Sequence, residues 1–488
     1  MIDRRQFMHT AAAAAAGIAW GCADGAAEPS RRRAVPRGAE ILRSAGGRLE
    51  ASLHAAESIV DLGGRQGRLF AFNGLVPGPR CELEAGDEVT LTLDNALGEP
   101  TNLHLHGLHV PPTGAADNIF LHIPSGESFT YRFTIPPDHP AGLFWIHPHL
   151  HGSVARQVSR GLAAPFVIRG AIDDVPEVAA ADEFIFVVQD FELGPTGEVL
   201  EPSMPELMLG REGSLVTLGG SRNPVIPIRR GGLVRLRLVN GSASRFYRLR
   251  LEEHPLHLIG VDGGALDAVR TVDEILFLPG ERLDILVEGT RDEGAFRLLD
   301  LPYDRGMAGM MGGMMGGGMM GGARGGSGSA TPTTLATFEY RGRAEKPRGL
   351  PQALPGTLGA LPRPGGETRR FQLGQGMGMG RGMSFTINGR EFAADRIDSR
   401  VGLGSVEEWE YVNNTPMDHP MHLHTNPFQL VGADGSVDPA WRDVVLVPAN
   451  GRARFRVRFD DFAGKAVHHC HILDHEDQGM MATVMMES

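Results

Sequence analysis

The sequence predicts an all-β protein built from three β-sandwich domains. Short segments that alternate apolar and polar residues dominate the chain, and Gly, Pro, Asn or Asp turn signals bound them. One strand pattern occurs three times, as GDEVTLTLDN at 86–95, GGLVRLRLVN at 231–240 and VEEWEYVNN at 406–414. No amphipathic helix of more than three turns is evident, and 66 glycines with 33 prolines suit a turn-rich β architecture.

The alternating segments are assigned to strands in chain order. In a strand, successive side chains point to opposite faces, so each segment can bury one face against a core. The three copies of the recurring pattern suggest three homologous domains, which we place at 41–172, 180–342 and 368–488. The clearest strands are 88–95, 128–135, 183–191, 232–240 and 452–459.

Residues 1–22 are predicted to be a twin-arginine export signal, with Arg4-Arg5 followed by Phe7 and an apolar run. The run is too short to span a bilayer, and no other segment has transmembrane length. Cys22 stands at the end of this run and is a candidate for lipid attachment. Ala19, three residues before it, argues against lipidation, because a leucine is more usual at that position. Residues 23–40 are predicted to be a polar tether, and the mature protein is expected in the periplasm or cell envelope.

The charge and the cysteine content of the chain limit the kinds of partner that it can bind. The net charge of -12 argues against nucleic acid and is compatible with the attraction of cations. The chain has three cysteines, Cys22, Cys81 and Cys470, and the metal site expected at Cys470 leaves no disulfide framework. The protein is expected to be a monomer.

Two segments, 306–322 and 376–383, are rich in methionine and glycine, and they hold ten of the 20 methionines. Methionines set in polyglycine cannot form a core, because ordering the glycines costs too much entropy. One interpretation is a disordered linker of biased composition. The other is a mobile array of thioethers, which are soft ligands suited to Cu(I). The methionines of the first segment are Met307, Met310, Met311, Met314, Met315, Met319 and Met320.

Histidines form four clusters, at 104–106, 147–149, 419–424 and 468–475. His-x-His in a strand places both imidazoles on one face, as shared metal ligation requires. In the last cluster Cys470 lies between His469 and His471, and His475 and Met480 follow. A thiolate, an imidazole and a thioether form a blue-copper site once one more histidine joins them. The two flanking histidines point away from the cysteine and are free to hold a second metal centre.

In this order, the four clusters resemble the signature of the three-domain multicopper oxidases, the family of laccases, ascorbate oxidase and bacterial cuprous oxidases. The resemblance implies cupredoxin-like Greek-key β-sandwich domains and four copper ions. It implies a type 1 copper held by His419, Cys470, His475 and Met480, and a type 2 copper held by His104 and His422. For the two type 3 coppers it implies His106, His147 and His471 on one, and His149, His424 and His469 on the other.

The same resemblance implies the reaction. Substrate loses one electron at a time at the type 1 copper, electrons pass through Cys470 and its two neighbours, and O2 is reduced by four electrons to water. The reduction consumes protons, and Asp117 and Glu476 are the candidate donors. The alternative to a role as proton donor is that each of these two side chains is an ordinary solvated acid on the protein surface.

Three functions compete at this point. A cuprous oxidase of copper tolerance is favoured by the methionine-rich segments, and Met417 and Asp418 beside His419 would help them to hold a substrate copper. A laccase-like oxidase of phenols is the alternative. A non-catalytic copper-binding or structural protein is disfavoured, because every ligand position of the family motif is filled.

Overall fold

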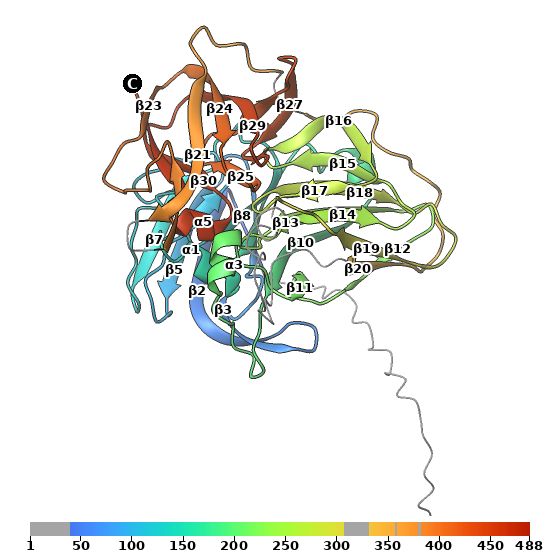
Figure 1. The fold of residues 1–488 in the computed structure, drawn as a ribbon. Helices are drawn as coiled ribbons and strands as arrows, with labels where there is room; N and C mark the ends of the chain where they lie inside the picture. Colours follow the sequence, from blue (N-terminus) through green and yellow to red (C-terminus); the bar gives the residue numbers. More distant parts are fainter. Residues whose placement is uncertain (1–39, 307–330, 357–358, 379–381) are drawn as a thin grey trace, which may run out of the picture. The chain divides into compact units, whose positions relative to one another are not determined.

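The computed structural model describes residues 40–306, 331–356, 359–378 and 382–488. The predicted signal segment, Cys22 and the methionines of 306–322 lie outside these ranges. Strands account for nearly all regular structure in the described residues, which confirms the all-β prediction (Figure 1). The described helices are short: α1 (Val154–Ser159), α2 (Pro176–Ala179), α3 (Met204–Leu209) and α5 (Leu473–Asp477). None of them has the length and apolar character needed to cross a bilayer.

The first part of the chain forms a four-stranded sheet, β3-β2-β5-β7, and a five-stranded sheet, β1-β4-β9-β8-β6. Both sheets contribute to one buried core that includes Leu91, Tyr131 and Phe166. The strands are β1 (Ile41–Arg43), β2 (Arg48–Asp61), β3 (Gln66–Phe72), β4 (Arg80–Glu84), β5 (Glu88–Asn95), β6 (His104–His106), β7 (Ser128–Thr134), β8 (Gly142–His147) and β9 (Ala164–Arg169).

The middle part repeats this arrangement with a six-stranded sheet, β11-β10-β13-β18-β15-β16, and a five-stranded sheet, β12-β20-β19-β14-β17. Its core includes Leu236, Ile285 and Phe338. The strands are β10 (Asp182–Phe191), β11 (Leu215–Leu218), β12 (Val225–Ile228), β13 (Leu233–Asn240), β14 (Tyr247–Leu251), β15 (Leu256–Val261), β16 (Gly264–Val272), β17 (Ile275–Phe277), β18 (Arg282–Glu288), β19 (Ala295–Leu301) and β20 (Thr333–Tyr340).

The last part has a six-stranded sheet, β22-β21-β24-β29-β26-β27, and a five-stranded sheet, β23-β31-β30-β25-β28. Trp409, Phe455 and Cys470 lie in its core. Each of the three sheet pairs thus has a large core of its own, and the bounds 41–172, 180–342 and 368–488 stay our proposal for three domains. The strands are β21 (Arg369–Gly378), β22 (Gly382–Ile387), β23 (Ser399–Gly402), β24 (Ser405–Asn413), β25 (His419–Leu423), β26 (Phe428–Val431), β27 (Val437–Arg442), β28 (Val444–Val447), β29 (Arg452–Phe459), β30 (Gly464–Cys470) and β31 (Met481–Glu487).

The recurring sequence pattern becomes β5, β13 and β24, which occupy equivalent places in their sheets. Each pairs in parallel with an earlier strand and antiparallel with a later one. Each ends in a buried asparagine, Asn95, Asn240 or Asn413. In all three, the amide nitrogen donates to two or more backbone carbonyls and the amide oxygen accepts the N–H two residues on. A buried turn needs such partners for its peptide groups.

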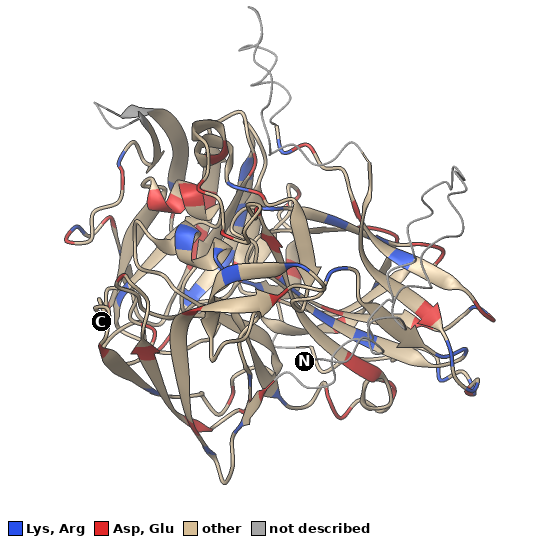
Figure 2. Ribbon diagram, turned by 90° about the horizontal axis from the view of Figure 1, so that it is seen from below, with Lys and Arg blue, Asp and Glu red and all other residues tan. Residues whose placement is uncertain are grey.

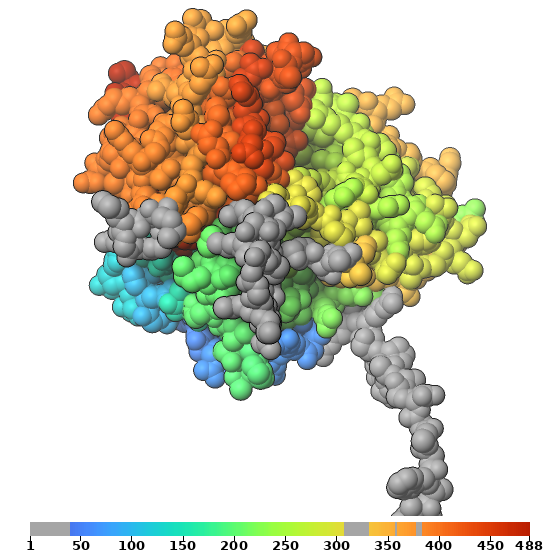
Figure 3. Space-filling model, viewed as in Figure 1, coloured from blue at the N-terminus to red at the C-terminus, as the bar shows by residue number. Residues whose placement is uncertain are grey.

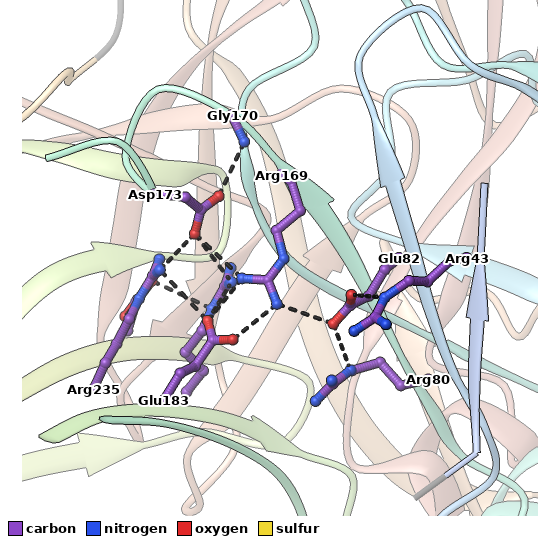
Figure 4. Close-up of polar contacts among 10 residues, drawn as sticks. Arg43, Arg80, Glu82, Arg169, Gly170, Asp173, Glu183 and Arg235 are labelled. Carbon is purple, nitrogen blue, oxygen red and sulfur yellow. Dashed lines mark hydrogen bonds and ion pairs between the residues drawn. The ribbon is translucent and has the colours of Figure 1, made fainter. Parts of the chain in front are cut away.

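A chain of ion pairs joins the first and middle parts (Figure 4). Arg169 of β9 contacts Glu82 of β4 at 2.9 Å and Glu183 of β10 at 2.8 Å. Arg235 of β13 extends the chain through Asp173 at 2.5 Å and pairs with Asp284 of β18 at 2.6 Å. Elsewhere basic and acidic residues are interspersed along the ribbon (Figure 2).

Candidate metal centre

Two pairs of neighbouring strands carry most of the clustered histidines. β6 pairs with β8, which sets His104 opposite His147. β25 pairs with β30, which sets His422 opposite His469 and Met421 opposite Cys470. The first pair belongs to the first sheet pair of the chain and the second to the last. The histidines can therefore meet only where these two parts adjoin; the surfaces of the two parts are drawn in Figure 3 in blue to cyan and in orange to red.

Eight histidines, which we call the eight-histidine group, come together there. Within it His106, His147 and His471 form one set and His149, His424 and His469 a second, and the ligand atoms of each set lie within 4.8 Å of one another. These are the two sets predicted for the type 3 coppers. The predicted type 2 pair also meets, with 3.3 Å between the Nε2 atoms of His104 and His422. The group comprises His104, His106, His147, His149, His422, His424, His469 and His471.

Low pKa values keep most histidines of this group neutral, which is the form of imidazole that binds a metal ion. Burial lowers the pKa of His147 to about 3, although the Pro148 carbonyl that accepts its Nδ1–H acts in the other direction. Burial, and then the neighbouring imidazoles, hold the pKa well below the usual range for six more histidines: His104, His106, His149, His424, His469 and His471. Neutral imidazoles offer lone pairs, which cations bind.

Backbone carbonyls fix which nitrogen faces inward. A carbonyl can only accept, so the Nδ1 atoms of His147, His422 and His469 must donate to their carbonyls, at 2.8, 2.8 and 3.0 Å. Their Nε2 lone pairs then point into the group. Among the described residues, buried His106 Nδ1, His147 Nε2 and both nitrogens of His471 have no hydrogen-bond partner. Leaving such atoms unpaired is costly, and bound metal ions would satisfy them. The donor set therefore fits the implied type 2 and type 3 coppers.

A second set of ligand atoms surrounds Cys470. Its Sγ lies 3.4 Å from His419 Nδ1 and 3.8 Å from His475 Nδ1. The other nitrogen of His475 donates to the Met208 carbonyl at 3.1 Å, and His419 Nε2 lies 2.7 Å from Thr415 Oγ1. Both rings thus turn Nδ1 toward the sulfur. Burial raises the pKa of the Cys470 thiol, so a cation is needed to hold it as a thiolate. One thiolate and two imidazoles fit the implied type 1 copper.

Met480, the predicted fourth ligand, is buried in the same core. Its carbonyl accepts the Cys470 N–H at 3.0 Å, and its N–H donates to the His475 carbonyl at 2.9 Å. The backbone therefore binds the segment after α5 to the cysteine and to the histidine within α5.

The two carboxylates predicted near the group are both fully or almost fully buried, so neither is a surface acid. Asp117 Oδ1 lies 2.9 Å from His104 Nδ1 and accepts the Leu105 N–H at 2.7 Å. Burial raises the pKa of Asp117 to about 7, and the Leu105 hydrogen bond limits the rise. Glu476 lies between His149 and His469, with each carboxylate oxygen 3.6 Å from one of their Nδ1 atoms.

Glu476 differs from Asp117 in its partners. Neither of its oxygens has a hydrogen-bond partner among the described residues. Burial, and then the charge of Asp477, raise the pKa of Glu476 well above its usual range. A protonated carboxyl beside two ligand candidates can hold a proton that a surface acid would lose.

The structure adds residues that the sequence did not indicate. Asp443 Oδ1 lies 3.2 Å from His106 Nε2, and the Asp443 carbonyl accepts from His422 Nδ1. Arg282 of β18 holds that carboxylate, with Nη1 2.6 Å from Oδ1. Arg282 lies in a strand and Asp443 between β27 and β28, and neither stands at metal-site spacing from another ligand type, so no local signal could have identified them.

Of the predicted substrate-copper residues, Asp418 and Met417 lie in the described part of the chain. Asp418 accepts from the Tyr303 hydroxyl at 2.6 Å and from the Ala449 N–H at 2.8 Å. Met417 is fully buried in the core of the last part. The methionines of 306–322 lie outside the described residues.

Known proteins show the same organisation. Three family models, each described as multicopper oxidase, match residues 55–172, 196–302 and 364–488. Multicopper oxidase MmcO of Mycobacterium tuberculosis is 28% identical over 91% of this chain and 88% of its own length. Cell division protein FtsP of Dickeya dadantii is 26% identical over 87% of each chain.

A solved structure is similar along most of the chain. It is a multicopper oxidase from Campylobacter jejuni described as a metallo-oxidase, with 28% identity and a TM-score of 0.75, covering 94% of this chain and 98% of that one. The fold is thus the cupredoxin-like β architecture that the resemblance implied. The chain belongs to the multicopper oxidases, the copper-dependent oxidoreductases that use O2 as electron acceptor.

Proposed function

We propose that this protein couples one-electron oxidation of a reducing substrate at a type 1 copper to reduction of O2 to water at a cluster of three coppers. The ligands proposed for the type 1 copper are His419, Cys470, His475 and Met480. His104 and His422 would hold the type 2 copper, and the other six members of the eight-histidine group the type 3 pair. One observation carries the proposal: Cys470 lies in one ligand set while its covalent neighbours, His469 and His471, lie in the other.

When bound, the four coppers supply the electron transfer and the binding and reduction of O2. The residues of the chain supply the surroundings. Carbonyls hold His147, His422 and His469 with Nε2 free, and burial keeps bulk water from the cysteine. Peptide bonds join the cysteine to a histidine on each side, which makes a short covalent route between the two centres. We propose Asp117 and Glu476 as the proton donors, because each lies beside histidines of the group.

For the substrate, we propose Cu(I), with a role in copper tolerance. Seven methionines of 306–322 supply soft thioether ligands, and Asp418 adds a carboxylate next to His419. The description of the Campylobacter jejuni relative as a metallo-oxidase agrees with such a substrate. A laccase-like oxidation of phenols is the second candidate, because partly exposed Tyr303, which stacks on buried Phe246, offers an aromatic ring beside Asp418.

A structural role without turnover is disfavoured. The FtsP relative is named a cell division protein. A purely structural protein has no need to bury eight imidazoles side by side and to leave nitrogens such as His106 Nδ1, His147 Nε2 and both of His471 without a hydrogen-bond partner among the described residues. That burial costs stability when no metal is bound.

The substrate proposal is tested by O2 consumption of the copper-loaded protein with Cu(I) and with 2,6-dimethoxyphenol. Two variants isolate the methionines: deletion of 306–322, and replacement of its seven methionines by leucine, which keeps length and apolar character. We expect both variants to lose about tenfold in kcat/KM for Cu(I), as for the loss of about 1.4 kcal/mol of binding, and to keep phenol oxidation.

Unchanged Cu(I) oxidation in both variants would contradict a role for the methionines. Faster turnover of the phenol than of Cu(I) by the unmodified protein would favour the laccase-like alternative. Oxidation of neither substrate would contradict the oxidase function itself.

We further propose export by the twin-arginine route to the periplasm or cell envelope, a monomeric state, and a possible lipid anchor at Cys22. Arg4-Arg5 and the short apolar run support the route. Replacement of Arg4 and Arg5 by lysine should leave the protein in the cytoplasmic fraction. Replacement of Cys22 by alanine should release it from the membrane fraction if the anchor exists.

A further inference from the structure

The middle part of the chain supplies none of the proposed copper ligands, yet one of its side chains is connected to the eight-histidine group through Asp443. Arg282, at the start of β18, is only 1% exposed. Its guanidinium makes a two-pronged contact with Asp443, Nη1 to Oδ1 at 2.6 Å and Nη2 to Oδ2. Asp443 in turn contacts His106 through its carboxylate and His422 through its carbonyl.

The other N–H groups of Arg282 are also used. Nε donates to the Leu143 carbonyl at 3.2 Å, Nη1 to Gly280 at 3.0 Å and Nη2 to Asp262 at 2.9 Å. Leu143 belongs to the first part of the chain, Gly280 and Asp262 to the middle part, and Asp443 to the last. One side chain therefore links all three parts beside the proposed copper cluster.

The backbone around Arg282 is shaped for this approach. Gly107 directly follows His106, and a Cβ there would overlap the Arg282 guanidinium and the Asp443 carboxylate. Gly280, two residues before Arg282, packs so closely on the eight-histidine group that a Cβ there would lie 2.8 Å from His471 Nε2. Both glycines have positive φ, 84° in each case, so the turns also favour glycine.

The contacts of Asp443 determine which ring nitrogen of His106 and of His422 is free to bind a metal. Asp443 Oδ1 accepts from His106 Nε2, so His106 Nδ1 is the nitrogen left for a metal, and it has no other partner among the described residues. The Asp443 carbonyl accepts from His422 Nδ1, so His422 presents Nε2 toward His104. Partners of this kind set the tautomer and the ring orientation of metal-binding histidines.

We propose that Arg282 is a positioning residue of the three-copper cluster, which fixes His106 and His422 by holding Asp443 in place. This inference rests on the proposed function. The rigid planar fork of arginine can fix both oxygens of a carboxylate, whereas a lysine ammonium acts as a point charge and cannot. The middle part thus controls copper binding at a site to which it donates no ligand.

The test compares Arg282→Lys with Arg235→Lys. Arg235 is a matched control, because it is 2% exposed, lies on the neighbouring strand β13, and holds Asp284 with two prongs at 2.9 and 2.6 Å. It also links parts of the chain, through the network of Figure 4. Both variants keep a buried positive charge and lose a bidentate contact between a guanidinium and a carboxylate. Of the two arginines, only Arg282 contacts a carboxylate that touches the eight-histidine group.

The measurements are bound copper per chain, the type 2 EPR hyperfine pattern and the visible spectrum of the type 1 site. In Arg282→Lys we expect the type 2 signal to change and cluster copper to be retained about tenfold less tightly, in the range typical for lost partners of metal ligands. The type 1 spectrum should persist. Arg235→Lys should keep all three signatures of the unmodified protein.

An unchanged type 2 signal and copper content in Arg282→Lys would overturn the inference, as would equal losses in both variants. If Arg282→Lys does not fold, Asp443→Asn gives the second test, since it weakens the same contact from the other side and should alter the same type 2 signal. Failure of the proposed function is distinct, because the unmodified protein would then lack the type 1 and type 2 signatures as well.

Discussion

Cys470 and Cys81 show how surroundings decide what a cysteine does. Both are fully buried, and burial raises the thiol pKa of each, to about 12 for Cys81. Acidity therefore does not distinguish them. The difference is that two imidazole nitrogens, His419 Nδ1 and His475 Nδ1, face the sulfur of Cys470, whereas Cys81 packs among apolar side chains.

Replacement of Cys470 by serine should remove the intense blue absorption of the copper-loaded protein and reduce oxidase activity to background. A serine hydroxyl is a harder and more weakly ionised ligand than a thiolate, so it cannot form a blue-copper site. Cys81→Ser is the matched control and should keep colour and activity. Visible absorption and O2 consumption check both variants, and retained activity in Cys470→Ser would refute the proposed electron route.

At the scale of elements, α5 depends on contacts with the other parts of the chain. It has only five residues and cannot be stable alone, yet it carries His475. On one side Asp474 accepts from Arg211, from Nη2 at 2.7 Å and from the backbone N–H at 2.8 Å. On the other side Asp477 accepts the N–H groups of Gly152 and Ala155, where α1 begins.

Replacement of Asp474 by alanine should destabilise the protein by about 1–3 kcal/mol, because Arg211 loses its charged partner, and should alter the type 1 EPR spectrum by freeing His475. Asp438→Ala is the control: its ion pair with Arg270, at 2.6 Å, also joins the middle and last parts but lies between β16 and β27. Denaturant unfolding and EPR separate the two effects. An unaltered type 1 spectrum in Asp474→Ala would show that Arg211 does not position His475.

At the scale of the molecule, the eight-histidine group exists only when distant parts of the chain meet. His104 and His422 are 318 residues apart, and His149 and His469 are 320 apart. Folding thus gathers buried imidazoles, and several of their nitrogens, such as His106 Nδ1 and His147 Nε2, have no hydrogen-bond partner among the described residues. This is a local cost that metal binding offsets.

Removal of copper should therefore lower the unfolding temperature, and its return should restore it. At a free copper concentration about 1,000 times Kd, each site adds about 4 kcal/mol. Calorimetry of the metal-free protein with added copper measures the change. Magnesium is the control, since it prefers oxygen ligands and should have no effect. Equal unfolding temperatures with and without copper would contradict the proposed ligand sets.

The sequence by itself determined the strands, and it predicted three repeated units and the composition of both ligand sets. Strand alternation and His-x-His spacing are short-range properties, so they can be read from neighbouring residues. The strands at 88–95, 183–191, 232–240 and 452–459 follow the predicted segments to within a residue. The close approach of the predicted type 3 sets agrees with the motif order. The export signal and the methionine array stay predictions.

Only the tertiary structure decided which groups support those ligands. Asp443 contacts His106 across 337 residues, and Arg282 contacts Asp443 across 161. Met208 holds His475 across 267 residues through a carbonyl, a group that every residue possesses. Such contacts leave no mark in local spacing, because they depend on how the three sheet pairs pack and not on the pattern within any strand.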